Sequence, residues 1–280
     1  MAPFPAGIRL FATDLDGTVL IDGGPEGCYA TPRLKAALRA LQESGVIVCL
    51  ASGRMHEGMR MIGDEIGLHG PIISYNGGML RDADDTLVCC KTLDADLAAE
   101  VAEFAEAEDL ALNYYLDGAL YARRIAPWWD LYLGRTSSPM REVQSHASLK
   151  GQRPYKLLIC SEPERIRELR DRLAPRFEGR CTLMITSDEY LEFVPLGVDK
   201  GDALAVLAER LGFKAEQVAA AGDGWNDLGM LRWAGFGIAM GSGRAALKEI
   251  ADVVVPGPLE DGLAAFIESR SNREGAAARG

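Results

Sequence analysis

Two aspartates separated by one residue, Asp14 and Asp16, follow an apolar run over residues 8–12. The run predicts a buried strand, and Gly17 lets the backbone turn directly after the acids. Residues i and i+2 of an extended chain project to the same side, so both carboxylates are expected to face one small ligand. Such carboxylates repel each other unless a proton or a cation intervenes, and Mg²⁺ prefers oxygen ligands. The stretch therefore predicts an acidic cation site at the end of a strand.

Polar side chains also follow three other predicted strands. They are Ser52 after residues 46–50, Asn76 after 71–74, and Asp223 with Asp227 after 217–221, while Lys200 precedes a helix predicted over 201–211. The carboxyl ends of parallel strands share one edge of a sheet, where α/β proteins bind ligands. A phosphate monoester is a dianion, so its charge must be cancelled before a carboxylate attacks it. These acids, the hydroxyl, the amide and the lysine together favour phosphoryl transfer.

The two acids of the first stretch then take different parts in that chemistry. With Mg²⁺ held by Asp14 and Asp223, one oxygen of Asp14 can still attack phosphorus. Asp16 is placed to protonate the leaving oxygen and later to activate water.

The order of elements predicts an α/β fold in which a Rossmann-like parallel-sheet core carries an inserted α+β cap domain. Apolar strands alternate with helices over residues 1–81 and again over 195–270, which is typical of a parallel sheet covered on both faces. Residues 82–194 differ, with a helix expected over 94–108, a hairpin around Asp117-Gly118, and strands over 156–160, 181–185 and 190–194. Residues 123–151 are expected to be irregular with one short helix, and residues 271–280 to form a disordered tail.

Composition limits the class of partner. A net charge of −11, with 25% charged and 48% hydrophobic residues, favours a globular protein and argues against binding to nucleic acid or anionic membranes. The partner expected is a small phosphorylated substrate, captured in a local cationic pocket by a monomer or a small homo-oligomer. No apolar run is long enough to span a membrane, and the six cysteines show no metal-binding spacing, so we expect buried, reduced thiols in a cytoplasmic protein.

Four short motifs carry a resemblance to a known family. In order, Asp14-Leu15-Asp16-Gly17-Thr18, Ala51-Ser52-Gly53-Arg54, Lys200, and Gly222-Asp223 with Asn226-Asp227 resemble the motifs of the haloacid dehalogenase superfamily of phosphatases. The insertion over 82–194, together with Tyr75-Asn76-Gly77-Gly78, is similar to the Cof-type, sugar-phosphatase-like branch with a subtype IIB α/β cap. Ser242 departs from the pattern, because relatives often carry asparagine there.

The resemblance implies roles for individual residues. It implies Asp14 as the nucleophile that forms an aspartyl-phosphate, Asp16 as the general acid and base, and Mg²⁺ bound by the Asp14 side chain, the Asp16 carbonyl and Asp223. The other implied roles are phosphoryl binding by Ser52 and Lys200, substrate contact by Gly53, Arg54, Asn76 and Asn226, and support by Thr18 and Asp227.

Several alternatives stay open at this point. The first motif alone also fits a turn or a calcium-like loop, and Ser52 also fits the N-cap of the next helix. Residues 241–246 fit the GxGxxA fingerprint of dinucleotide-binding oxidoreductases, although near the end of the chain. A phosphomutase of the same superfamily and a non-catalytic ligand-sensing member are further alternatives. Glu192 is expected to contact substrate or to be an exposed strand acid, and the substrate itself is left open.

Overall fold

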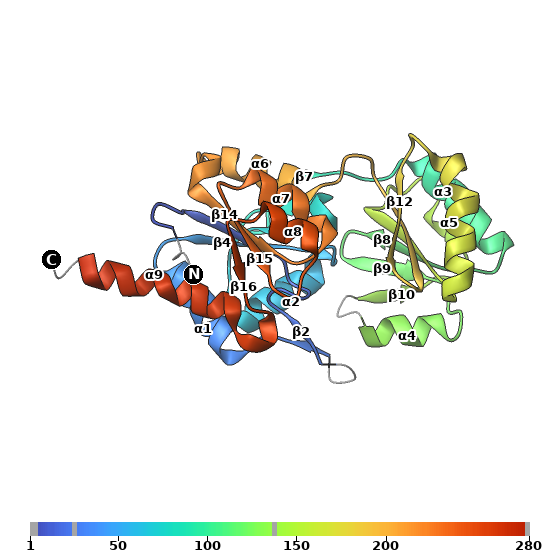
Figure 1. Ribbon diagram of the computed structural model, residues 1–280. Helices are drawn as coiled ribbons and strands as arrows, with labels where there is room; N and C mark the ends of the chain where they lie inside the picture. The colour runs from blue at the N-terminus through green and yellow to red at the C-terminus, as the bar shows by residue number, and fades with distance from the viewer. Residues whose placement is uncertain (1–4, 24–26, 136–138, 278–280) are drawn as a thin grey trace. The chain divides into compact units, whose positions relative to one another are not determined.

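The computed structural model describes residues 5–23, 27–135 and 139–277. It divides into two compact units, Met1–Cys89 with Asp199–Gly280, and Cys90–Val198 (Figure 1). The first unit is the Rossmann-like core, and the second is the α+β cap that the sequence inserts into it.

The core contains an eight-stranded sheet. Its strand order is β16 (Val253–Val255), β15 (Phe236–Met240), β14 (Val218–Gly222), β1 (Leu10–Thr13), β4 (Ile47–Ala51), β5 (Ile72–Ser74), β6 (Met79–Arg81) and β7 (Leu87–Cys90). The strands from β16 to β5 are parallel, and β6 turns back antiparallel to β5. The central strand β1 is fully buried, which its apolar sequence requires in a sheet covered on both faces.

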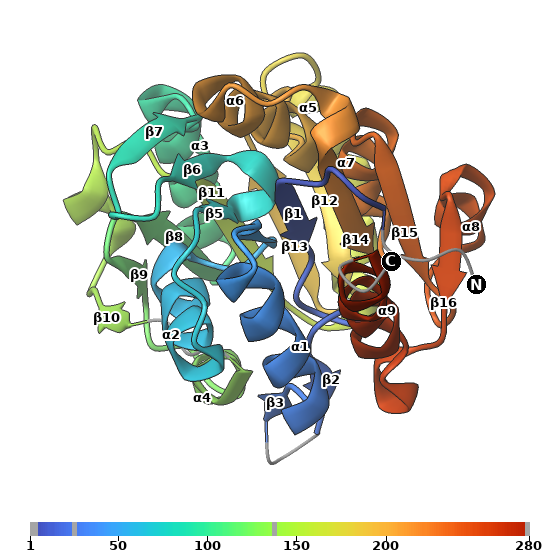
Figure 2. The same cartoon turned by 90° about the vertical axis from the view of Figure 1, so that its left-hand side faces the viewer.

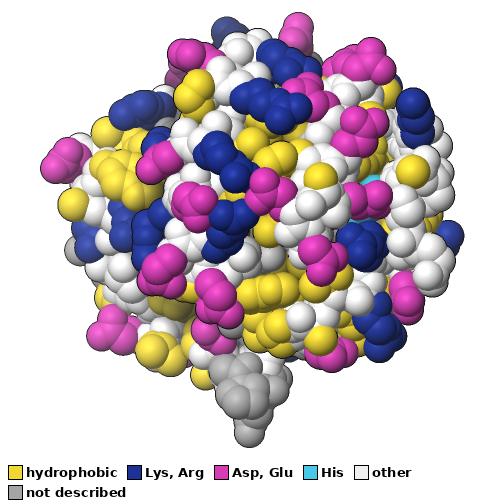
Figure 3. Space-filling model, turned by 90° about the vertical axis from the view of Figure 1, so that its right-hand side faces the viewer, with side chains coloured by type: hydrophobic (Ala, Val, Ile, Leu, Met, Phe, Trp, Pro, Cys, Tyr) yellow, Lys and Arg dark blue, Asp and Glu magenta, His cyan; other side chains and the backbone are white. Residues whose placement is uncertain are grey.

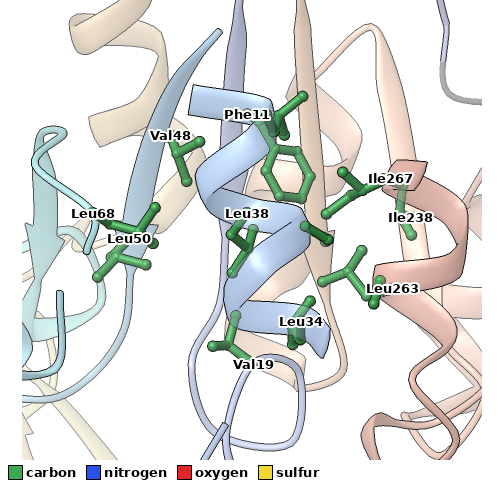
Figure 4. Packing of buried hydrophobic residues seen from close by; sticks show 14 of the residues in the cluster. Phe11, Val19, Leu34, Leu38, Val48, Leu50, Leu68, Ile238, Leu263 and Ile267 are labelled. Atoms are coloured by element: carbon green, nitrogen blue, oxygen red, sulfur yellow. The ribbon is translucent and has the colours of Figure 1, made fainter. Parts of the chain in front are cut away.

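Helices cover both faces of this sheet. The helices are α1 (Pro32–Glu43), α2 (His56–Ile66) and α9 (Gly262–Ala277) on one face, and α6 (Lys200–Leu211), α7 (Leu228–Trp233) and α8 (Ala245–Ile250) on the other. α1 and α9 lie side by side (Figure 2). Leu38 of α1 packs among Phe11 of β1, Val48 of β4 and Leu263 of α9 (Figure 4). Burial of these side chains stabilises the packing of the helices on the sheet. Truncating one such leucine to alanine typically costs about 2–5 kcal/mol of stability.

Short elements complete the core. Among the described residues they are the hairpin of β2 (Ile21–Asp22) and β3 (Cys28–Tyr29), and the single-turn helices η2 (Tyr75–Gly77), η4 (Ala215–Gln217), η5 (Trp225–Asp227) and η6 (Pro258–Glu260). Thr31 caps α1, because its hydroxyl accepts the Leu34 N–H at 3.1 Å.

The cap contains a six-stranded sheet. Its order is β10 (Met140–Glu142), β9 (Ala119–Ala122), β8 (Ala111–Leu116), β11 (Lys156–Cys160), β13 (Tyr190–Val194) and β12 (Thr182–Ser187), with helices α3 (Ala95–Ala107), α4 (Trp128–Arg135), α5 (Pro163–Phe177) and the turn η3 (His146–Leu149). The pairings are antiparallel except for β9 with β10. The predicted hairpin around Asp117-Gly118 is confirmed as β8 and β9. Apolar side chains of α3 and α5 pack on one face of the sheet, around Leu112 and Phe193.

Two neighbouring central strands of the cap sheet, β11 and β13, carry a buried ion pair. Lys156 Nζ donates to Glu192 Oε1 at 2.9 Å, and both side chains are more than 90% buried. The same ammonium lies 4.7 Å from the centre of the Tyr115 ring. The prediction that Glu192 is an exposed strand acid is therefore wrong, because a lysine on the neighbouring strand pairs with it inside the cap. The alternative that Glu192 contacts substrate stays a prediction.

Three other local expectations change. The six cysteines all lie in the described residues and form no disulfide, but Cys28 and Cys90 are exposed, so the prediction of uniformly buried cysteines is wrong for these two. Residues 123–151 hold the expected short helix α4, together with β10 and η3. α9 runs to Ala277, so residues 271–277 are helical where composition predicts disorder, and 278–280 lie outside the described residues.

Charged side chains of the cap surface are largely paired. Arg165 and Arg172 of α5 contact Glu108, while Arg176 and Arg180 contact Glu100. The space-filling view shows basic and acidic side chains intermixed on the face drawn (Figure 3). Within the described residues, none of the helices has the length and apolar character needed to cross a membrane.

Candidate active site

Strand register brings the predicted acids and the hydroxyl to one edge of the core sheet. Thr13, the last residue of β1, lies opposite Leu50 of β4 and Ala221 of β14. Each of these three strands then ends within one residue and releases a polar side chain: Asp14 after β1, Ser52 after β4 and Asp223 after β14. Parallel pairing of apolar strands is thus sufficient to gather the first three site residues.

A buried lysine links two of the carboxylates. Lys200 Nζ lies 2.6 Å from Asp14 Oδ1 and 2.6 Å from Asp227 Oδ1, and the lysine and Asp227 are fully buried. Burial raises the pKa of Asp14; Lys200 opposes this shift, and the charges of Asp227 and Asp16 add to it. Burial alone would lower the pKa of Lys200, but its two carboxylate partners outweigh burial and raise the pKa above its ordinary value. Lys200 therefore stays charged between two acids.

Both oxygens of Asp227 accept hydrogen bonds within the site. Its Oδ1 accepts from Lys200, and its Oδ2 accepts the backbone N–H groups of Asp223 and Gly224 at 3.0 and 2.9 Å. Asp227 thus fixes the loop after β14 and orients Lys200.

Asp14, Asp223 and Asp227 form one acidic cluster, with ligand atoms within 4.8 Å of one another. Desolvation by burial raises the pKa of Asp223, and the negative charge of Asp227 raises it further. Thr18 Oγ1 lies 3.4 Å from Asp223 Oδ1. Three carboxylates face one ammonium, so a divalent cation would balance the remaining charge. The oxygen donors of this cluster fit a divalent cation.

Two glycines make room for Asp223. A Cβ on Gly17 would lie 2.5 Å from Asp223 Oδ2, and Gly17 has φ +79°. A Cβ on Gly243 would lie 2.8 Å from Asp223 Cα. Gly243, the second glycine of the GxGxxA fingerprint, therefore leaves space for Asp223 to lie against the loop after β15.

Asp16 differs from Asp14 in both exposure and partner. β1 ends at Thr13, so the chain is not extended through Asp16 as the sequence predicts. The half-exposed carboxylate of Asp16 receives two bonds from Arg54, Nε to Oδ2 at 2.9 Å and Nη2 to Oδ1 at 2.5 Å. This pairing raises the pKa of Arg54. In the structure Asp14 contacts Lys200 and Asp16 contacts Arg54, and that both acids face one ligand stays a prediction.

The remaining predicted residues lie around the same loops. Ser52 Oγ accepts the Arg54 N–H at 3.2 Å, and α2 begins only at His56, so the prediction that Ser52 caps the helix is wrong. Asn226 Nδ2 donates to Asn76 Oδ1 at 2.9 Å. A Cβ on Gly53 would lie 2.9 Å from the Asn76 side chain, which explains a glycine between Ser52 and Arg54.

The structure therefore gathers the predicted residues into two groups. One group is Asp14, Thr18, Lys200, Asp223 and Asp227, and the other is Asp16, Ser52, Gly53, Arg54, Asn76 and Asn226. The bond between Arg54 and Asp16 was not predicted, although both residues follow neighbouring strands of the predicted sheet. The arrangement offers a carboxylate beside a fixed ammonium, a second carboxylate with its own guanidinium, and a place for a cation.

Comparison with known proteins identifies the family. The family model of haloacid dehalogenase-like hydrolases matches residues 11–267. A solved haloacid dehalogenase-like hydrolase from Bacteroides thetaiotaomicron has 28% identity and a TM-score of 0.85, covering 93% of this chain and 98% of that one.

Two curated relatives have names that state an activity. The HMP-PP phosphatase of Serratia proteamaculans is 30% identical over 242 residues, which cover 86% of this chain and 87% of the relative. The 5-amino-6-(5-phospho-D-ribitylamino)uracil phosphatase YcsE of Bacillus subtilis is 29% identical over 268 residues, which cover 93% and 94%. With this fold and this site, the chain belongs to the haloacid dehalogenase-like hydrolases, as a phosphatase of their Cof-type branch.

Proposed function

We propose that this phosphatase is Mg²⁺-dependent, acts on small phosphorylated metabolites, and works through an aspartyl-phosphate on Asp14. The observation that supports this most directly is the buried chain of Asp14, Lys200 and Asp227 beside Asp223. A carboxylate held next to an ammonium, in a cluster that calls for a divalent cation, is the arrangement that attack on a phosphate dianion requires. Mg²⁺, held by the Asp14 and Asp223 side chains and the Asp16 carbonyl, would neutralise phosphoryl charge.

The first half of the reaction transfers the phosphoryl group to the enzyme. An Asp14 oxygen attacks phosphorus, and the bond from phosphorus to the ester oxygen breaks with its electron pair on that oxygen. Asp16 in its protonated form gives the leaving oxygen a proton. Lys200 and the Ser52 hydroxyl hold the phosphoryl oxygens, while Thr18 and Asp227 keep Asp223 and Lys200 in place.

The second half returns the enzyme to its starting state. A water molecule gives its proton to Asp16 and attacks phosphorus, and the bond from phosphorus to Asp14 breaks with its electron pair on Asp14. Inorganic phosphate then leaves.

We assign the chemistry to the core and substrate selection to the cap, with 1–81 and 195–270 as catalytic and 82–194 as selective. In support, every proposed site residue lies in the core unit. Gly53, Arg54, Asn76 and Asn226 are proposed to contact the substrate. The two named relatives act on different phosphorylated compounds, so we propose the shared class, a small phosphate ester. The charge of −11 supports a protein that binds neither nucleic acid nor anionic membranes. We also propose that it is a cytoplasmic monomer or small homo-oligomer.

A phosphate-release assay tests the proposal. The purified chain is offered an aryl phosphate and a panel of sugar, glycerate, flavin and pyridoxal phosphates, with Mg²⁺ or with EDTA. We expect turnover only with Mg²⁺, its loss in Asp14→Asn, and its retention in Asp64→Asn, which changes an exposed acid of α2. Phosphorus NMR of the products would reveal an isomerised ester in place of free phosphate if the enzyme were a phosphomutase. Equal release by Asp14→Asn and the wild type would overturn the proposal.

A further inference from the structure

A cavity of about 810 Å³ opens in the core unit beside Asp223. Its walls come from the chain that follows β1, β15 and β16. These strands are parallel members of one sheet, so the cavity lies at the edge that also carries the proposed active site. A volume of this size is within the range of about 300–1,000 Å³ that small-molecule sites occupy.

Apolar side chains line both the base and the rim of the cavity. Leu20 and Ile21 are buried, whereas Leu259 of η6 is 76% exposed. Pro256 and Pro258 lie in the same wall and restrict its backbone, so the hollow is formed before any ligand arrives. An apolar group bound here would remove the exposed surface of Leu259 from water.

The charged side chains of the cavity are all acidic. Asp22, Asp223 and Glu260 line it, and no lysine or arginine does so within the described residues. Glu260 Oε2 accepts the Gly257 N–H at 3.2 Å, and in the part of the chain that the structure describes Glu260 has no ion-pair partner. An anionic ligand is therefore disfavoured in the cavity, whereas an ammonium group would gain an ion pair.

Asp223 joins the cavity to the proposed phosphoryl site. It lines the cavity, and it also belongs to the cluster with Asp14 in which ligand atoms lie within 4.8 Å of one another. An ester whose phosphoryl group is held at Asp14 can therefore extend its organic part into the cavity. The acidic wall keeps the phosphate itself beside Lys200.

We propose that the cavity beside Asp223 binds the organic part of the substrate and selects an apolar group that carries an ammonium. The apolar part covers Leu259, and the ammonium pairs with Glu260. Amine-bearing phosphate esters are then better substrates than uncharged esters, and esters with a second anionic group are the poorest. This inference rests on the proposed function: it names the class of leaving group and adds a contribution from the core to the selection assigned to the cap.

Three aryl phosphates of similar shape test the inference with the full chain in Mg²⁺. They carry an aminomethyl, a hydroxymethyl or a carboxyl group in the para position. We expect kcat/KM to be roughly fivefold higher for the ammonium ester than for the alcohol ester, and lowest for the carboxylate ester. Glu260→Gln, which keeps an oxygen for the Gly257 N–H, should lower the ratio of the ammonium ester to the alcohol ester roughly fivefold. Leu259→Ala should raise KM for all three esters.

Two matched control variants come from α2. Asp64→Asn removes the same charge from an exposed acid, so it accounts for the general attraction of a cation to a protein with a net charge of −11. Met61→Ala shortens an apolar side chain that is 58% exposed, as a control for Leu259→Ala. Both control variants should keep the ratio and the KM values of the wild type.

Binding is also measured without turnover, from the broadening of the ¹⁹F NMR line of 4-fluorobenzylamine by the full chain. We expect less broadening with Glu260→Gln and Leu259→Ala than with the wild type and the two controls. Equal kcat/KM for the three esters, or a change of ratio in Glu260→Gln no larger than in Asp64→Asn, would overturn the inference while turnover leaves the proposed function standing. A wild type that releases phosphate from none of the esters would overturn the proposed function and the inference together.

Discussion

At the scale of residues, the site works by giving neighbouring carboxylates unlike surroundings. Asp14 and Asp227 share the buried ammonium of Lys200, whereas Asp16 is half exposed and faces Arg54. Burying the carboxylates of Asp14 and Asp227 costs folding free energy unless a cation compensates their charges. Lys200 therefore stabilises the fold as well as taking part in the proposed chemistry.

Replacing Lys200 with methionine should be costly to stability. Lys200→Met leaves two buried carboxylates facing each other, and we expect a loss of roughly 3–5 kcal/mol in the free energy of unfolding, measured with urea in EDTA at neutral pH. The control is Lys35→Met. Lys35 lies 2.6 Å from Glu65 on the surface, and its loss should cost less than about 1 kcal/mol. Equal losses in the two variants would contradict the account.

At the scale of elements, tight turns after the strands decide how closely the acids approach. The turn at Gly17 brings the backbone against Asp223, and the loop after β15 does so at Gly243. Each approach leaves no space for a Cβ, so these glycines fix the position of a proposed metal ligand.

Gly17→Ala should therefore damage the site more than the fold. The new methyl group would overlap Asp223, and we expect kcat/KM to fall roughly a hundredfold and the Mg²⁺ concentration for half-maximal activity to rise. Gly45→Ala provides the comparison, because Gly45 also has a positive φ of +87° but has no neighbour within 4 Å of the added Cβ. Gly45→Ala should lose about 1 kcal/mol of stability and keep its activity. A normal Mg²⁺ requirement in Gly17→Ala would be the contrary result.

The elements were predictable where the pattern is local. Continuous apolar runs before Asp14, Ser52 and Asp223 predicted three parallel strands and, through them, the shared edge. Pairings between side chains distant in sequence were not predictable. The ion pairs of Arg54 with Asp16 and of Lys156 with Glu192 depend on strand register and side-chain rotamers. Hydrophobic periodicity contains no information about either.

At the scale of the whole molecule, stability should depend on pH through a buried histidine of the cap. His146 is 2% exposed, and its Nε2 donates to the Leu112 carbonyl at 3.0 Å. Burial lowers the pKa of His146, although the Leu112 carbonyl and the Glu106 carboxylate oppose the shift and Arg123 reinforces it. The folded protein therefore holds this imidazole neutral at pH values where the unfolded chain begins to charge it.

The sign of the effect follows from linkage. Below the unfolded-state pKa of about 6.5, the unfolded chain binds a proton that folded His146 does not, so stability falls with falling pH by at most about 1.4 kcal/mol per pH unit from this group. The decline ends at the lowered folded-state pKa. Thermal unfolding of the full chain between pH 7.5 and 5 should show a shallower dependence in His146→Gln than in the wild type. Parallel curves for the two proteins would show that His146 is not responsible.

The most direct test of the central claim is to locate the phosphoryl group on the enzyme during turnover. The chain is mixed with p-nitrophenyl phosphate and Mg²⁺, quenched in acid within the first turnovers, digested, and analysed by mass spectrometry. Asp16→Asn serves as the variant expected to accumulate the intermediate, because Asp16 is proposed to activate the water of the second half-reaction. We predict an acid-stable, hydroxylamine-sensitive phosphate on Asp14, in the peptide that also contains Asp16. Turnover without a label on Asp14, or a label on another residue, would contradict the account.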